Sequence, residues 1–131
     1  MAKYVFPAVF TKEREGGYSI YFPDVEGCIT QGEDLQDGLD MANDALCLML
    51  YHLEEKHESI PTPTDPLEIK IDENSFVSLV HCDTLEYRKF YDNKAVKKTL
   101  TIPAWLNSMA EKAEINFSQV LQNALKDQLQ V

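Results

Sequence analysis

Two segments near the start of the chain are dominated by β-forming side chains. Residues 4–10 are rich in aromatic and β-branched residues, a glycine pair follows, and residues 18–22 resume the same pattern. This arrangement predicts a β-hairpin. A third strand is predicted at residues 28–31, because Gly27 and Gly32 bracket a short extended segment.

The hydrophobic spacing changes to that of a helix between Leu35 and about His57. Six apolar residues step by three or four positions along this segment: Leu35, Leu39, Ala42, Leu46, Met49 and Leu53. At about 100° per residue they form one stripe, which we expect to pack on the sheet. Asp37, Asp40 and Asp44 fall on the opposite side, so the outer face of the helix is predicted to be acidic.

A proline-rich connector follows the helix. Three prolines within residues 60–66 exclude continued helix there. Residues 67–71 alternate between apolar and polar side chains and predict a strand, and residues 76–80 form a compact apolar run typical of a covered strand. The fold class is therefore predicted to be α+β, with an N-terminal sheet of three to four mainly antiparallel strands packed by one long helix.

The C-terminal part has a different order of elements. Residues 96–102 predict a short strand that Pro103 ends, and residues 105–113 carry apolar side chains at helical spacing. Residues 116–119 have the Asn-x-x-Gln arrangement of a capping box, which predicts the start of a second helix. This part is therefore predicted to be a strand–helix–helix module.

We divide the chain into residues 1–90, a hinge at residues 91–95, and the module at residues 96–131. A module of this size cannot bury its own apolar faces, since chains below about 40 residues rarely have enough core. The simplest solution is a homodimer whose short strands pair antiparallel, with Leu100 and Ile102 turned into the shared core. Whether such dimers assemble further into a tetramer stays open.

Alternation along the paired strands would send Lys97, Thr99 and Thr101 to the exposed face. A two-stranded ribbon of this kind fits the major groove of double-stranded DNA, where Lys and Thr can contact base edges. The capped start of the second helix would supply free N–H groups for a phosphate clamp formed by Asn116, Phe117 and Ser118.

The segment Lys98–Pro103, followed by Asn116–Leu121, resembles the ribbon–helix–helix fold of bacterial repressors. The strand-ending proline and the capped second helix carry the resemblance. In that family three alternating outward residues of the strand read bases, and they correspond here to Lys97, Thr99 and Thr101. The alternative is a module that only dimerises, since Thr and Lys are ordinary residues of exposed strands.

A second resemblance covers about the first 55 residues. The segments Tyr18–Asp24 and Gly27–Glu33, with the amphipathic helix behind them, are similar to the HicB antitoxin family, which has a partial ribonuclease-H-like N-terminal domain. The chain departs from many relatives in Gly38 and Asp40, early in the helix, and in its long proline connector.

This resemblance implies the antitoxin of a type II HicA–HicB-like toxin–antitoxin system. Residues 1–90 would bind and mask a small, basic HicA-like toxin that cleaves messenger RNA. Residues 96–131 would bind operator DNA and repress the shared operon. The alternative function is a stand-alone ribbon–helix–helix transcriptional regulator, with an N-terminal domain that binds a ligand or oligomerises and with no toxin partner.

The helix carboxylates are the candidates for the toxin-binding surface. A basic, RNA-binding toxin is attracted to carboxylates by the fields that attract it to RNA. The candidate residues are Asp34, Asp37, Asp40 and Asp44. The alternative is a helix face that is simply solvated, which is the usual role of a charge run.

The net charge of −10 argues at first against nucleic-acid binding, since phosphate affinity comes mostly from clustered Lys and Arg. The charge is unevenly distributed, because residues 1–95 carry −11 and residues 96–131 carry +1. The acidic excess thus belongs to the N-terminal part. The near-neutral module predicts poor non-specific DNA affinity, so operator binding should depend on base contacts and helix ends.

The sequence predicts neither catalysis nor a bound cofactor. Asp24, Glu26 and Asp72 are the carboxylates that a ribonuclease-H-like metal site would use, but Asp24 follows a proline in a turn, where Asp is common for its backbone hydrogen bonds. The three cysteines are widely spaced, and His81–Cys82 lacks a second ligand pair, so no metal site is expected. No apolar run approaches the roughly 18 residues of a membrane span, and we expect a cytoplasmic protein.

Overall fold

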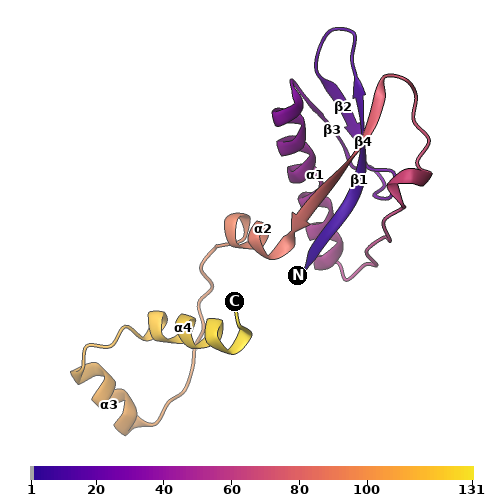
Figure 1. Ribbon diagram of the computed structural model, residues 1–131. Coiled ribbons are helices and arrows are strands. Elements are labelled where there is room, and N and C mark those ends of the chain that lie inside the picture. Colours follow the sequence, from indigo (N-terminus) through magenta and orange to yellow (C-terminus); the bar gives the residue numbers. More distant parts are fainter. Residues whose placement is uncertain (1) are drawn as a thin grey trace. The chain divides into compact units, whose positions relative to one another are not determined.

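The chain forms two compact units, Met1–Lys94 and Ala95–Val131, in a computed structural model that describes residues 2–131. The first unit holds a sheet with its helices, and the second holds two helices (Figure 1). The predicted α+β class is confirmed. Among the described residues, no helix is both long and apolar enough to cross a membrane.

Four strands form the sheet of the first unit, in the order β3-β2-β1-β4, and every neighbouring pair is antiparallel. The strands are β1 (Lys3–Lys12), β2 (Tyr18–Tyr21), β3 (Ile29–Gly32) and β4 (Ser75–Asp83). The predicted hairpin is the β1–β2 pair, and the covered strand predicted at residues 76–80 is the middle of β4.

The long helix α1 (Leu35–Glu55) covers one face of this sheet (Figure 1). Phe6, Phe10 and Ile20 from the strands are fully buried together with Leu46 and Leu50 from the helix. Burial of these large side chains favours folding, by about 25 cal/mol for each Å² of apolar surface removed from water.

The predicted apolar stripe of α1 is only partly right. Ala42 and Leu46 are buried as expected, but Leu35 and Leu39 are 54% and 43% exposed. In the first turns of the helix, Gly38 is instead the residue that is buried against the sheet. A Cβ atom at Gly38 would lie 3.1 Å from the Phe10 ring, so the missing side chain is what lets the helix approach the sheet.

The connector between α1 and β4 passes on the other side of the sheet (Figure 1). The backbone N–H and the hydroxyl of Thr64 both donate to the carboxylate of Asp24, which ties the connector to the end of β2. The strand predicted at residues 67–71 is wrong. Asp65 accepts from the N–H of Leu67, and the short 3₁₀ helix η1 (Pro66–Glu68) forms in its place, because Pro66 suits the first position of a helical turn.

A short helix that the sequence analysis did not predict, α2 (Thr84–Tyr91), follows β4 directly. The carboxylate of Asp83 accepts from the N–H groups of Leu85 and Glu86 and so caps the helix start. The helix packs against α1. The predicted hinge, residues 91–95, begins at its last residue.

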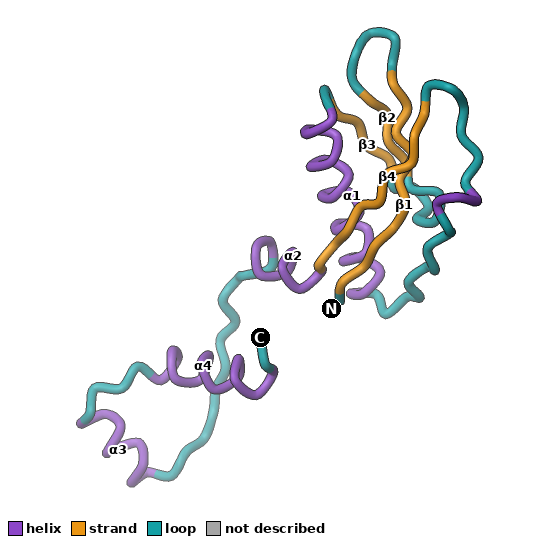
Figure 2. Tube along the Cα trace, viewed as in Figure 1, coloured by secondary structure: helices purple, strands orange, loops and turns teal. Residues whose placement is uncertain are grey.

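The second unit contains α3 (Ala104–Lys112) and α4 (Phe117–Leu129), as predicted. Residues 96–102, predicted to be a strand, have no strand pairing within a single chain and are drawn as loop in Figure 2. The reason is physical, since a strand needs a partner strand to satisfy its backbone groups and the described part of this unit offers none. No residue of α3 or α4 is buried.

Candidate functional site

Two of the candidate toxin-binding carboxylates hold the start of α1 together. Asp34 is the N-cap residue, and its carboxylate accepts from the N–H of Asp37 at 2.8 Å. The carboxylate of Asp37 in turn accepts from the N–H of Glu33 at 2.8 Å. The Asp34 carboxylate thus satisfies a backbone donor that the helix leaves unpaired, and the Asp37 carboxylate binds the backbone just before the helix, so both residues have a structural role.

The other two candidates, Asp40 and Asp44, are exposed further along α1. Asp40 accepts from the side-chain amide of Gln36 at 3.2 Å. Exposed leucines, Leu35 and Leu39, lie on the same half of the helix. The exposed surface of α1 therefore carries both apolar and acidic side chains, a composition that suits a protein contact.

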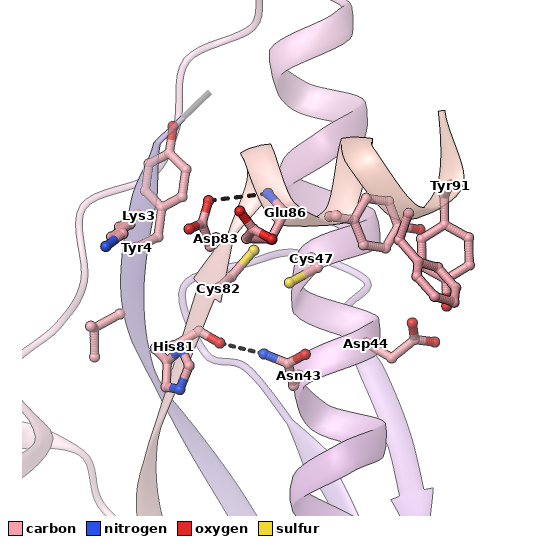
Figure 3. Close-up of a pocket in the computed structure, with 13 residues that line it drawn as sticks. Lys3, Tyr4, Asn43, Asp44, Cys47, His81, Cys82, Asp83, Glu86 and Tyr91 are labelled. Atoms are coloured by element: carbon pink, nitrogen blue, oxygen red, sulfur yellow. Dashed lines mark hydrogen bonds between the residues drawn. The ribbon is translucent and has the colours of Figure 1, made fainter. Parts of the chain in front are cut away.

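Asp44 borders a groove of about 740 Å³, which we call the α1–α2 groove (Figure 3). Its walls come from β1, α1, β4 and α2. The lining residues are Lys3, Tyr4, Val5, Asn43, Asp44, Cys47, His81, Cys82, Asp83, Glu86, Tyr87, Phe90 and Tyr91. The side chain of Asn43 donates to the backbone carbonyl of His81 at 2.6 Å and so joins α1 to the edge strand at the floor of the groove.

Aromatic side chains of α2 form one wall of the groove. Phe90 and Tyr91 are 75% and 61% exposed. The Tyr91 ring lies 4.5 Å from the Tyr87 ring and 4.8 Å from the Phe90 ring, measured between centroids. Burial, followed by the nearby Asp44 charge, raises the pKa of Tyr87 above its ordinary value. The groove is thus both aromatic and electronegative.

Two thiols face each other inside the groove. The sulfur atoms of Cys47, on α1, and Cys82, on β4, point toward one another (Figure 3). Their mutual hydrogen bond lowers the pKa of Cys47 and raises that of Cys82. Burial raises the pKa of the third thiol, Cys28, to about 11. All three cysteines are buried and free, as structural thiols are.

Glu54, near the end of α1, fixes the position of α2. Its carboxylate accepts from the Tyr4 hydroxyl at 2.8 Å, from the Thr84 hydroxyl at 2.9 Å, and from Arg88 at 3.1 Å. Burial alone would raise the pKa of Glu54, but the hydrogen bonds outweigh it and hold the pKa below its ordinary value. Burial and this hydrogen bond also raise the pKa of Tyr4 to about 12.

The carboxylates considered for nuclease chemistry do not come together. Asp24 holds Thr64, and Asp72 accepts from the N–H of Asn74 and the hydroxyl of Ser75 in the turn before β4. Glu26 is exposed in the loop after β2. Within residues 2–131, no group of three or more His, Cys, Asp or Glu side chains is spaced to hold a metal ion.

In the second unit, Lys97, Thr99 and Thr101 are all exposed on the extended segment, and so are the alternate residues Leu100 and Ile102. Leu100 and Ile102 line a hollow of about 590 Å³, the α3–α4 hollow, together with apolar side chains of both helices. This unit therefore has an apolar surface that its own helices do not cover.

The predicted cap of α4 is half confirmed. The Asn116 side chain accepts from the N–H of Gln119 at 3.1 Å, as a capping residue does. The Gln119 side chain does not return to Asn116 but donates to Asn123 at 3.0 Å. Phe117 and Ser118 form the first turn, whose N–H groups have no intrahelical acceptor, and the side chains of both border the α3–α4 hollow.

Sequence reasoning missed the α1–α2 groove because it missed α2. Two signals were present. Asp83 and Glu86 have the spacing of a capping arrangement, and Tyr87 and Tyr91 are four residues apart, as on one helix face.

Residues 6–124 match the model of the HicB-like antitoxin family of bacterial toxin–antitoxin systems. The chain belongs to this family. Antitoxin HicB 1 of Photorhabdus laumondii is 38% identical over 58 residues, and antitoxin HicB of Escherichia coli K12 is 36% identical over 59 residues. These alignments cover 37% and 43% of the relatives, so this HicB-like chain matches less than half of their length.

Solved structures extend the similarity of this HicB-like chain to both units. A chain of a toxin–antitoxin complex from Streptococcus pneumoniae is 29% identical, with a TM-score of 0.64, over 96% of this chain and 99% of that chain. A chain of the HicA3 and HicB3 toxin–antitoxin complex is 27% identical, with a TM-score of 0.51, over 61% of this chain and 99% of that chain. The antitoxin HicB of Burkholderia pseudomallei shares the fold at 19% identity and a TM-score of 0.55.

Proposed function

We propose that this HicB-like chain is the antitoxin of a HicA–HicB-type pair and that it acts by binding rather than by catalysis. The observation that carries the proposal is the family match, which extends through both units from residue 6 to residue 124. The first unit would bind a basic HicA-like toxin that cleaves messenger RNA and would occlude its active surface. Such a toxin acts where messenger RNA is, so we place the pair in the cytoplasm.

The surface we propose for the toxin lies on α1 and α2. Its charge supports this role, since the part of the chain before residue 96 carries −11, and a basic partner is steered to such a surface. Because Asp34 and Asp37 are occupied in capping, Asp40 and Asp44 are the candidates with carboxylates turned outward. The exposed Leu35 and Leu39 would add apolar contact area.

We further propose that the second unit is a ribbon–helix–helix domain that forms a homodimer and binds operator DNA. The uncovered α3–α4 hollow supports dimerisation, because pairing two copies through residues 96–102 would bury Leu100 and Ile102. Lys97, Thr99 and Thr101 would then read bases. The first turn of α4, at Asn116, Phe117 and Ser118, would hold a phosphate, and the operon would be repressed by its own product.

Co-expression with the short basic protein encoded by a neighbouring reading frame tests this proposal. We expect the two proteins to purify as one complex and the toxic effect to disappear. The triple variant Lys97→Ala, Thr99→Ala, Thr101→Ala should lose operator binding and still neutralise the toxin. Loss of neutralisation in this variant would contradict the division of labour, and the absence of any toxic partner would favour a stand-alone regulator.

A further inference from the structure

The α1–α2 groove combines aromatic rings with carboxylates and has little positive charge of its own. Asp44, Asp83 and Glu86 line it, whereas Lys3 is the one Lys or Arg among its described lining residues. Asp83 is used as the cap of α2, and Glu86 forms an exposed ion pair with Lys89 at 3.2 Å. The Asp44 carboxylate lies on the side of the groove where Tyr91 ends α2 (Figure 3).

The same two helices already hold an arginine in such a setting elsewhere. The Arg88 guanidinium lies 4.5 Å from the centroid of the Tyr51 ring and pairs with Glu54 and Glu55. An aromatic face with two carboxylates is therefore an arginine-binding arrangement in this molecule. A guanidinium is planar, stacks on rings and bonds carboxylates in pairs, which an ammonium group does less well.

From this repeated chemistry we infer that the α1–α2 groove binds an arginine side chain of a partner protein. The guanidinium lies against the Phe90 and Tyr91 rings, and the nearby Asp44 accepts its hydrogen bonds, while Glu86, at the Asp83 end of the groove (Figure 3), adds negative charge. The identification of the partner as the toxin rests on the proposed function. The selection of arginine by the groove does not rest on it. The inference also moves the centre of the binding surface from the start of α1 to the junction of α1 and α2.

The direct test uses the full chain and N-acetyl-arginine methylamide as the probe, followed by amide chemical shifts. We expect shifts at Asp44, Glu86 and Phe90, and much smaller shifts with N-acetyl-citrulline methylamide, a neutral molecule of nearly the same shape. The double variant Asp44→Asn, Glu86→Gln should weaken probe binding about five-fold or more, and Phe90→Leu about two-fold or more, because the first removes charge and the second removes only the ring.

The matched control is Glu26→Gln with Glu73→Gln. Both residues are exposed and lie outside the groove, and the change in net charge is the same. Equal weakening by this control would overturn the inference, because the effect would then be general charge. Equal shifts with N-acetyl-lysine methylamide would overturn the choice of arginine. Absence of shifts, together with a changed oligomeric state of Phe90→Leu, would mean that a second copy of the chain covers the groove.

The toxin assay separates this inference from the proposed function. If the wild-type chain and the Asp44→Asn, Glu86→Gln variant capture the basic partner equally well, the proposed function stands and the groove inference is wrong. If the wild-type chain binds the arginine probe but captures no basic partner, the groove is an arginine site and the antitoxin proposal is wrong.

Discussion

At the residue scale, carboxylates that look alike in the sequence have different tasks. Asp34 and Asp37 satisfy backbone donors at the start of α1, whereas Asp44 borders the α1–α2 groove. Replacing a capping residue typically costs about 1 kcal/mol of stability. Weakened partner binding in an Asp34 or Asp37 variant therefore does not identify a contact, whereas the same loss in an Asp44 variant does.

Glu54→Gln tests the carboxylate that joins α1, β1 and α2. The substitution keeps the shape but removes the charge to which Tyr4, Thr84 and Arg88 donate, so it should lower the free energy of unfolding by about 1–3 kcal/mol at neutral pH. Urea denaturation measures this change. Glu26→Gln, at an exposed loop position, is the control and should change the free energy by less than about 0.5 kcal/mol.

The difference in stability between the wild type and Glu54→Gln is predicted to depend on pH. The folded-state pKa of Glu54 lies below its ordinary value, so its stabilisation is present above the unfolded-state pKa and is lost as the pH falls through the folded-state pKa. The difference in stability between wild type and Glu54→Gln should therefore shrink when the unfolding curves are repeated at acidic pH. A difference that grows on acidification would contradict this assignment.

The residue pattern located some core positions of α1 and misplaced others for a definite reason. Ala42 and Leu46 follow from helical spacing, because they lie in the middle of the helix where the apolar face meets the sheet. Leu35 and Leu39 are exposed, although the spacing predicts that they are buried. At that end of α1 the helix approaches the sheet at Gly38, and a glycine carries no hydrophobic signal. Hydrophobic periodicity cannot show that contact is made through a missing side chain.

At the scale of elements, the close approach of α1 to β3 depends on a pair of glycines. A Cβ atom at Gly32 would lie 2.4 Å from the Cα atom of Gly38, a backbone atom that cannot move aside. Gly32→Ala should therefore lower the free energy of unfolding by about 1–3 kcal/mol, as overpacking does. Thermal unfolding followed by circular dichroism measures it, with Gln31→Ala as the exposed neighbour that should have little effect.

The pairing proposed for residues 96–102 can be tested by substituting neighbouring residues that would face opposite sides of the strand. If residues 96–102 pair between two copies, Leu100 faces the shared core and Thr101 faces DNA. Leu100→Glu should then abolish the dimer and operator binding, whereas Thr101→Glu should abolish operator binding alone. Sedimentation equilibrium and a gel-shift assay report the two properties. A monomeric Thr101→Glu or a dimeric Leu100→Glu would contradict the pairing.

Two errors in predicting elements have physical explanations. The alternation at residues 67–71 is short, and the turn formed by Asp65 and Pro66 determines the backbone conformation there instead. The helix α2 is eight residues long, and so short a helix depends on packing against α1 and on the Asp83 cap rather than on its own periodicity. The groove beside it was missed because its wall is this helix.

At the scale of the whole molecule, the uneven charge separates two kinds of partner. The part before residue 96 carries −11 and the part from residue 96 onward carries +1. Raising the salt from about 0.1 M to about 1 M shortens the screening length from about 10 Å to about 3 Å. The affinity for a basic toxin, measured by calorimetry, should therefore fall as the salt concentration rises. At low salt, the Asp44→Asn, Glu86→Gln variant should bind the toxin more weakly than the Glu26→Gln, Glu73→Gln variant, which has the same net charge.

The family match extends through both units of the molecule, from residue 6 to residue 124. The β1–β2 hairpin, the long helix and both C-terminal helices could be read from hydrophobic patterns, whereas the order of the strands in the sheet could not. The pairing of residues 96–102 could be anticipated only by asking what would cover Leu100 and Ile102, since one chain contains no partner strand for them among its described residues.

The most direct test of the antitoxin proposal is RNA cleavage by the neighbouring basic protein, titrated with the full chain. We predict that cleavage falls in proportion to added chain and ends near one antitoxin per toxin, because inhibition is by occlusion. The Lys97→Ala, Thr99→Ala, Thr101→Ala variant should give the same titration. Cleavage that continues unchanged in an excess of the chain would contradict the account.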